Sequence, residues 1–154
     1  MKLAVIIDDE LTSLVSKGEI IDRYYNPGNF FSEVLIYVMN NKQVKLEEVK
    51  RTVGDAKLTI EYFNWNKWFF ILSLGMRPFM LKYLMKEIIT KIIMFEPDCI
   101  RCHDNNVNSF VANCVKEATG IPYAVSLHIN RDEDINGRLR TFKDSVINKL
   151  SERV

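Results

Sequence analysis

Short apolar runs alternate along the chain with stretches in which apolar residues recur at helical spacing. Five runs rich in Val, Ile and aromatic residues predict strands at Leu3–Ile7, Val34–Met39, Leu58–Phe63, Cys99–Cys102 and Tyr123–Leu127. Most of these runs are continuously apolar, which is typical of strands buried on both faces.

The intervening stretches predict helices. They lie from Pro78 to just before Pro97, along 107–118 with Asp104 or Asn105 as N-cap and Gly120 as C-cap, along 139–150, and as a short turn at 46–53 before Gly54. Strands joined by helical crossovers form a parallel sheet with helices on both faces. The predicted fold class is therefore α/β, a doubly wound, mostly parallel Rossmann-like sheet, and its 154 residues fit one domain, 1–154.

Composition and charge narrow the class of protein. With 47% hydrophobic and 27% charged residues, the chain is not a disordered one. Basic and acidic residues nearly balance at 21 and 20, so no nucleic-acid partner is expected. Three cysteines and the acidic start MKLAVIIDDE, which lacks the apolar stretch of a signal peptide, predict a cytoplasmic protein with reduced thiols.

Polar residues follow the predicted strands where ligands bind in doubly wound sheets, at the carboxyl ends. Asp8-Asp9-Glu10 follows the first strand, and the protein's two histidines, His103 and His128, follow the fourth and fifth. The helix that opens at Asn105 points its free N–H groups toward the same edge, which suits an anion. The alternative is that these residues are polar caps where strands meet solvent.

Two short motifs suggest other sites. Ile7-Asp8-Asp9-Glu10 resembles the Mg²⁺-holding acidic pocket of response-regulator receiver domains, but the third predicted strand ends without an aspartate and His128 stands where a receiver has lysine. Cys99-Ile100-Arg101-Cys102-His103 matches the C-x-x-C-H haem motif. On a strand, however, the two thiols would point to opposite faces, so buried apolar cysteines are favoured and no metal or haem is expected.

A longer pattern carries a family resemblance. The stretch 96–103 (EPDCIRCH), a helix, and the stretch 120–128 (GIPYAVSLH) resemble the amino-terminal half of GT-B glycosyltransferases of the large retaining, nucleotide-sugar-dependent family (group 1, or family 4). The stretch from Gly18 to Val34, in which Tyr24 to Asn29 precede a predicted strand, is also similar to some members. The resemblance implies one half of a GT-B fold that helps transfer a sugar from a nucleotide-sugar donor to an unidentified acceptor, with no metal and no further cofactor.

The resemblance also implies roles for individual residues. His128 would be the catalytic residue, contacting the donor sugar or stabilising charge during transfer. Substrate contacts would come from His103, Asp104, Asn105, Lys17 and Gly18. The last two stand in the expected loop Asp9–Ile20, where the family has more glycines, and an ordinary helix C-terminus is the alternative interpretation there.

The family needs a second, carboxyl-terminal domain to bind the donor, whereas this sequence ends at Val154 within a predicted helix. We therefore expect the acceptor-side domain of a longer enzyme, inactive alone.

Aromatic residues are concentrated along Trp65–Met76, just before a predicted helix that carries several lysines. Such a combination can lie at a lipid headgroup surface, which would suit a lipid-linked acceptor in cell-surface polysaccharide or glycolipid assembly. Packing of these aromatic residues in the core is the alternative. The competing function is a non-catalytic Rossmann-like module that binds a ligand or a partner protein.

Overall fold

The computed structural model describes residues 1–64, 68, 77–103 and 107–126. Within these ranges the strands are β1 (Lys2–Ile7), β2 (Glu33–Val38), β3 (Lys57–Tyr62), β4 (Cys99–His103) and β5 (Tyr123–Ser126). The helices are α1 (Leu11–Lys17), α2 (Leu46–Val49), α4 (Pro78–Leu84), α5 (Lys86–Phe95) and α6 (Val107–Thr119), with short 3-10 helices η1 (Pro27–Asn29) and η2 (Lys50–Val53).

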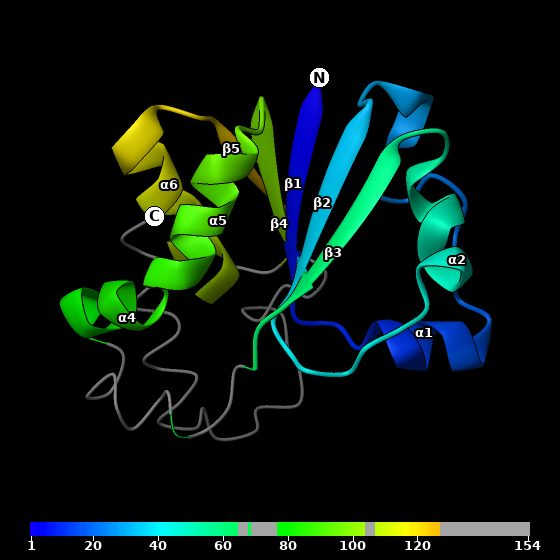
Figure 1. Cartoon of the computed structure of the whole chain (residues 1–154), viewed down its shortest axis with the longest axis horizontal. Helices are drawn as coiled ribbons and strands as arrows, with labels where there is room; N and C mark the ends of the chain where they lie inside the picture. The colour runs from blue at the N-terminus through cyan, green and yellow to red at the C-terminus, as the bar shows by residue number, and fades with distance from the viewer. Residues whose placement is uncertain (65–67, 69–76, 104–106, 127–154) are drawn as a thin grey trace, which may run out of the picture.

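The strands of the described residues form one parallel sheet in the order β3-β2-β1-β4-β5. Figure 1 shows α5 and α6 on one side of this sheet and α1 and α2 on the other. The predicted α/β, doubly wound Rossmann-like fold with helices on both faces is confirmed.

Each face of the sheet has its own apolar core, because successive side chains of a strand point to opposite faces. Ala4 and Ile6 of β1 pack with α5 and α6, whereas Leu3, Val5 and Ile7 pack toward α1 and α2. Both cores contain residues with no exposed surface, including Ile6 and Val5. The central strand is therefore buried on both sides, as its continuous apolar run predicts.

Two local expectations are wrong. The helix expected from Pro78 onward is two helices that meet at Met85, whose backbone angles (φ −89°, ψ 3°) leave the helical region while its side chain stays buried. The expected loop Asp9–Ile20 contains α1, because Leu11, Leu14 and Val15 present one apolar face to the core. Gly18 then ends this helix in the left-handed conformation (φ 70°).

Several predicted features lie outside the described residues. These are Asp104, Asn105, His128, the helix at 139–150, and the aromatic segment 65–76 apart from Trp68, whose side chain is 61% exposed. None of the described helices is both long and apolar enough to cross a membrane.

Candidate functional site

The sheet changes winding direction between β1 and β4. The crossovers from β1 to β2 and from β2 to β3 proceed toward one edge, and the next crossover returns to place β4 on the other side of β1. Such switch points are where doubly wound sheets bind ligands. Here Asp9 follows β1 and His103 ends β4, and His103 Nδ1 lies 3.8 Å from Asp9 Oδ2.

His103 is enclosed at this switch point, with 1% of its surface exposed. Its ring centroid lies 5.8 Å from that of Tyr24 and 5.7 Å from that of Tyr25. Its backbone carbonyl accepts a hydrogen bond of 2.8 Å from Asn108 Nδ2 at the start of α6. The imidazole is therefore held between two tyrosines and a carboxylate rather than turned to solvent.

The loop that carries Asp9 is fixed by residues that follow β2. Asn40 Nδ2 donates to the backbone carbonyls of Asp8 and Asp9, each at 3.2 Å. Lys42 Nζ lies 2.6 Å from Glu10 Oε1. Lys42 thus pairs with Glu10, while the Asp9 carboxylate, with its side chain 53% exposed, faces His103 and solvent.

Arg101 links Tyr24 to the sheet. Its Nη1 donates to the Tyr24 carbonyl at 3.1 Å, and its Nε donates to Ser126 Oγ on β5 at 3.0 Å. Its guanidinium also lies 5.5 Å from the centroid of the Tyr24 ring, in the range of a cation–π contact. One side chain therefore connects β4, β5 and the crossover from β1 to β2.

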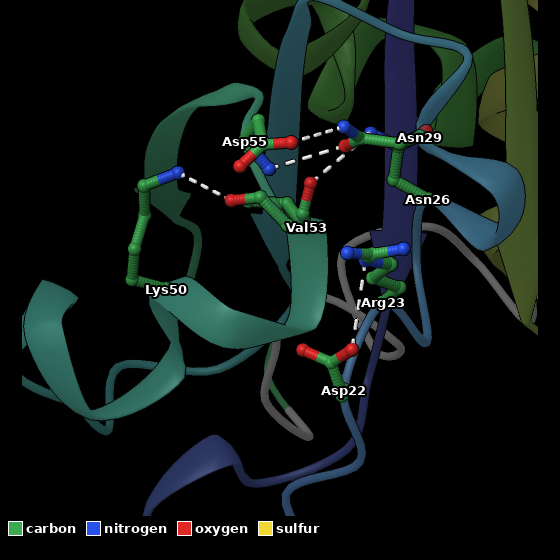
Figure 2. A network of polar contacts seen from close by, with 8 residues as sticks. Asp22, Arg23, Asn26, Asn29, Lys50, Val53 and Asp55 are labelled. Atoms are coloured by element: carbon green, nitrogen blue, oxygen red, sulfur yellow. Dashed lines mark hydrogen bonds and ion pairs between the residues drawn. The ribbon is translucent and has the colours of Figure 1, made fainter.

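The same crossover is anchored to η2 by a buried amide (Figure 2). Asn26 is 0% exposed; its Nδ2 donates to the carbonyls of Phe31 and Val53 at 3.0 Å, and its Oδ1 accepts from the Phe31 N–H at 3.1 Å. Beside it, Asn29 and Asp55 are joined by two hydrogen bonds. Tyr25 N–H donates to the Thr52 carbonyl at 2.9 Å, so the backbone next to Tyr24 is fixed as well.

A cavity of about 380 Å³ opens beside these tyrosines. Its most buried lining residues are Leu11, Ile20, Tyr25 and Thr52, each 7% exposed or less. Asp9, Glu19 and Ile21 line it at the exposed rim, and the half-buried Leu14 and Tyr24 complete the wall. This volume is near the lower end of the range for small-molecule sites, roughly 300 to 1,000 Å³, so it accommodates one small ligand.

Burial sets the protonation state of the groups near the site. It raises the pKa of the Tyr25 phenol well above its ordinary value, with the nearby Asp9 and Tyr24 adding to the effect and Arg101 opposing it. Tyr25 is therefore a neutral phenol at physiological pH. Burial also raises the pKa of Cys102 to about 12, and Cys102 and Cys99 pack into opposite cores. The prediction that these thiols lie on opposite faces is confirmed, and Cys102 is a poor nucleophile.

The structure gathers some of the predicted site residues and separates others. His103 lies at the switch point with Asp9, whereas Lys17 and Gly18 end α1. The Gly18 N–H donates to the Val15 carbonyl at 3.0 Å, which confirms the helix C-terminus interpretation. Contact of Lys17 and Gly18 with phosphate stays a prediction, as do the roles of Asp104, Asn105 and His128.

Sequence reasoning missed Arg101 as a member of the site. The signal was present, because a charged residue in an otherwise apolar predicted strand needs a partner. No group of three or more His, Cys, Asp or Glu side chains within the described ranges is arranged to hold a metal ion.

Comparisons with known proteins yield a distant structural similarity. No protein-family model matches the chain. No curated protein matches it either. Among solved structures, it is similar to two crystal structures of the C-terminal domain of a hydrogenase from Pyrococcus furiosus. One comprises residues 83–215, with 12% identity, a TM-score of 0.47, and coverage of 81% of this chain and 89% of that one. The other comprises residues 78–226, with 14% identity, a TM-score of 0.47, and coverage of 82% and 89%. At these identities and TM-scores the similarity carries no argument about function.

Proposed function

We propose that this chain is the acceptor-side domain of a nucleotide-sugar-dependent GT-B glycosyltransferase and holds a hydroxylated acceptor at the switch point between β1 and β4. The observation that carries the proposal is the cavity lined by Tyr24, Tyr25 and Asp9 beside the buried His103. It supports the function that the G-I-P and His patterns of the sequence imply.

The lining suits a sugar ring. Tyrosine rings offer apolar area to the C–H faces of a pyranose, while the neutral Tyr25 phenol and the Asp9 carboxylate can hydrogen-bond its hydroxyl groups. His103, through its contact with Asp9, acts as a positioning residue for that carboxylate. In this scheme the chain's residues bind and orient the acceptor, and His128 serves the donor sugar.

Charge favours an acceptor over a nucleotide-sugar donor in this cavity. Asp9 and Glu19 line it, and no lysine or arginine is among its described lining residues. A diphosphate would meet these two carboxylates and no lysine or arginine side chain on the described lining, which is electrostatically unfavourable. The donor is therefore assigned to a second domain, as the family resemblance implies.

The test is binding of sugars to the purified chain. We expect saturation-transfer NMR with a panel of p-nitrophenyl glycosides to show binding of at least one, and UDP-glucose and GDP-mannose to show none in this cavity. Tyr24→Ala should abolish the glycoside signal, since it removes one aromatic wall. The control Tyr83→Ala removes a tyrosine that is 73% exposed on α4 and should leave binding unchanged. Equal binding by wild type and Tyr24→Ala, or no glycoside binding at all, would count against the proposal.

A non-catalytic binding module is the second candidate, and the burial of His103 favours it. An imidazole with 1% exposure does not reach a bound substrate directly. The two candidates differ in the intact protein that contains this chain. Sugar transfer from UDP-glucose or GDP-mannose that disappears in His128→Ala supports the transferase, whereas sugar binding without transfer by the wild type supports the module.

A further inference from the structure

The helix α4 exposes aromatic side chains on the side where a helix at a protein surface ordinarily carries polar ones. Phe79 and Tyr83, one helical turn apart, are 64% and 73% exposed. The opposite side of the helix is fully packed, because Leu81 and Met85 have no exposed surface and belong to the core that includes α5 and α6. The two rings are therefore exposed on a firmly packed helix.

Basic side chains accompany the two rings. Lys82 follows Phe79 by three positions, which places it on the same side of α4, and Arg77 and Lys86 stand at the two ends of the helix. All three basic residues are exposed. Lys82 Nζ lies 3.7 Å from Glu117 Oε2, so its charge is partly offset, whereas no carboxylate of the described residues pairs with Arg77 or Lys86. The two rings and the three basic residues form what we term the α4 surface.

The sequence around the α4 surface keeps its charge positive. The stretch 62–86 contains Lys67 and the three basic residues of the α4 surface but no aspartate or glutamate, although basic and acidic residues nearly balance over the chain, at 21 and 20. The next carboxylate, Glu87, lies 3.2 Å from Lys91 Nζ, so this pair adds little net charge. Aromatic side chains among unbalanced cations match an anionic lipid surface.

We propose that the α4 surface docks on the headgroup region of an anionic lipid bilayer. Phe79 and Tyr83 lie among the headgroups, and the three basic residues contact the lipid phosphates. The contact is peripheral, because α4 has 7 residues and a membrane-spanning helix needs about 20. Figure 1 shows α4 beyond the start of α5, at the end of the sheet where the strands finish, which is also the end that carries the candidate site.

The experiment is co-sedimentation of the purified chain with lipid vesicles. We expect phosphatidylcholine vesicles with about 30% phosphatidylserine to bind the chain about 25-fold more tightly than pure phosphatidylcholine vesicles, because Arg77 and Lys86 each contribute about fivefold at an anionic surface. Raising the salt concentration to about 0.5 M should remove most of this preference by screening.

Variants with matched controls test the rings and the charges separately. Phe79→Ala should weaken binding to the anionic vesicles about tenfold, because it removes an inserted ring. Phe30→Ala should leave binding unchanged, since Phe30 is 73% exposed but follows η1, outside the α4 surface. Lys86→Gln should weaken binding about fivefold, and Lys57→Gln, at an exposed position of β3, should not.

The outcomes decide between a membrane and other occupants of the α4 surface. No vesicle binding, equal binding to both kinds of vesicle, or binding that resists both Phe79→Ala and Lys86→Gln would overturn the proposal. Self-association of the chain that Phe79→Ala abolishes, without vesicle binding, would overturn it and assign the α4 surface to a second copy.

The inference does not depend on sugar binding. Tyr83→Ala should weaken binding to anionic vesicles while it leaves the binding of soluble glycosides unchanged. Failure of vesicle binding would therefore leave the proposed function standing, and failure of glycoside binding would leave the membrane inference standing.

Discussion

Asn26 shows how one buried side chain positions the candidate site. It satisfies backbone groups of Phe31 and Val53 in a place that excludes water, and it directly follows the two tyrosines that contact His103. Because the crossover from β1 to β2 has no regular structure between Gly18 and η1, such contacts replace the hydrogen bonds that a helix would supply. The placement of Tyr24 and Tyr25 therefore depends on Asn26.

We predict that Asn26→Ala lowers the free energy of unfolding by about 2 to 3 kcal/mol, because it leaves buried backbone donors and acceptors without partners. It should also weaken glycoside binding. The control Asn113→Ala removes an amide whose Nδ2 donates an exposed hydrogen bond to Glu117 on α6, and it should change stability by less than about 0.5 kcal/mol. Urea denaturation of both variants measures the difference, and equal stabilities would show that the buried amide does not anchor the crossover.

The residues of the site were only partly predictable. The pattern placed His103 and Asp9 at neighbouring strand ends, which follows from strand order alone. The packing of His103 against the rings of Tyr24 and Tyr25 depends on the path of the crossover from β1 to β2. That path is set by contacts between positions far apart in sequence, such as Asn26 with Val53 and Arg101 with Tyr24. Hydrophobic periodicity reflects only residues that are close in sequence, so it does not predict these long-range contacts.

At the scale of elements, the helix predictions are right or wrong for identifiable physical reasons. The helix α6 matches its prediction because the apolar spacing and the Gly120 terminus agree, and Gly120 has φ 79°. The break at Met85 has no signal in the sequence, because no proline or glycine marks it and the apolar repeat continues through it into α5. Packing of α5 against the sheet, rather than local propensity, holds this segment in place.

The core face of α5 should therefore be sensitive to truncation. We predict that Ile92→Ala lowers the free energy of unfolding by about 2 to 4 kcal/mol, because Ile92 is 0% exposed and its removal leaves a cavity between α5 and the sheet. Met94→Ala, two positions along the same helix, removes a side chain that is 76% exposed and should cost less than about 1 kcal/mol. Thermal and urea denaturation compare the two, and similar losses would mean that α5 does not pack as described.

At the scale of the whole molecule, the sequence predicts the architecture well because strand identity, strand length and crossover type together leave few topologies. Its buried ionisable groups then give the protein a characteristic pH response. Burial raises the pKa of Cys102 from its ordinary value of 9.0 to about 12, and it raises the pKa of Tyr25 and Tyr37 above 10.0. These groups are distributed over both cores, so their titration reports on the entire fold.

The sign of the response follows from proton binding. Between pH 9 and 12 the unfolded chain has released protons that the folded protein still holds on these groups, so unfolding is favoured as pH rises. We predict full stability below about pH 9 and a progressive loss above it. Urea denaturation from pH 7 to 11 should show this decline, and Cys102→Ala should make it shallower because one thiol no longer contributes. A decline of the same steepness in Cys102→Ala would show that the thiol is not held protonated in the core, and a flat profile would contradict the burial of all three groups.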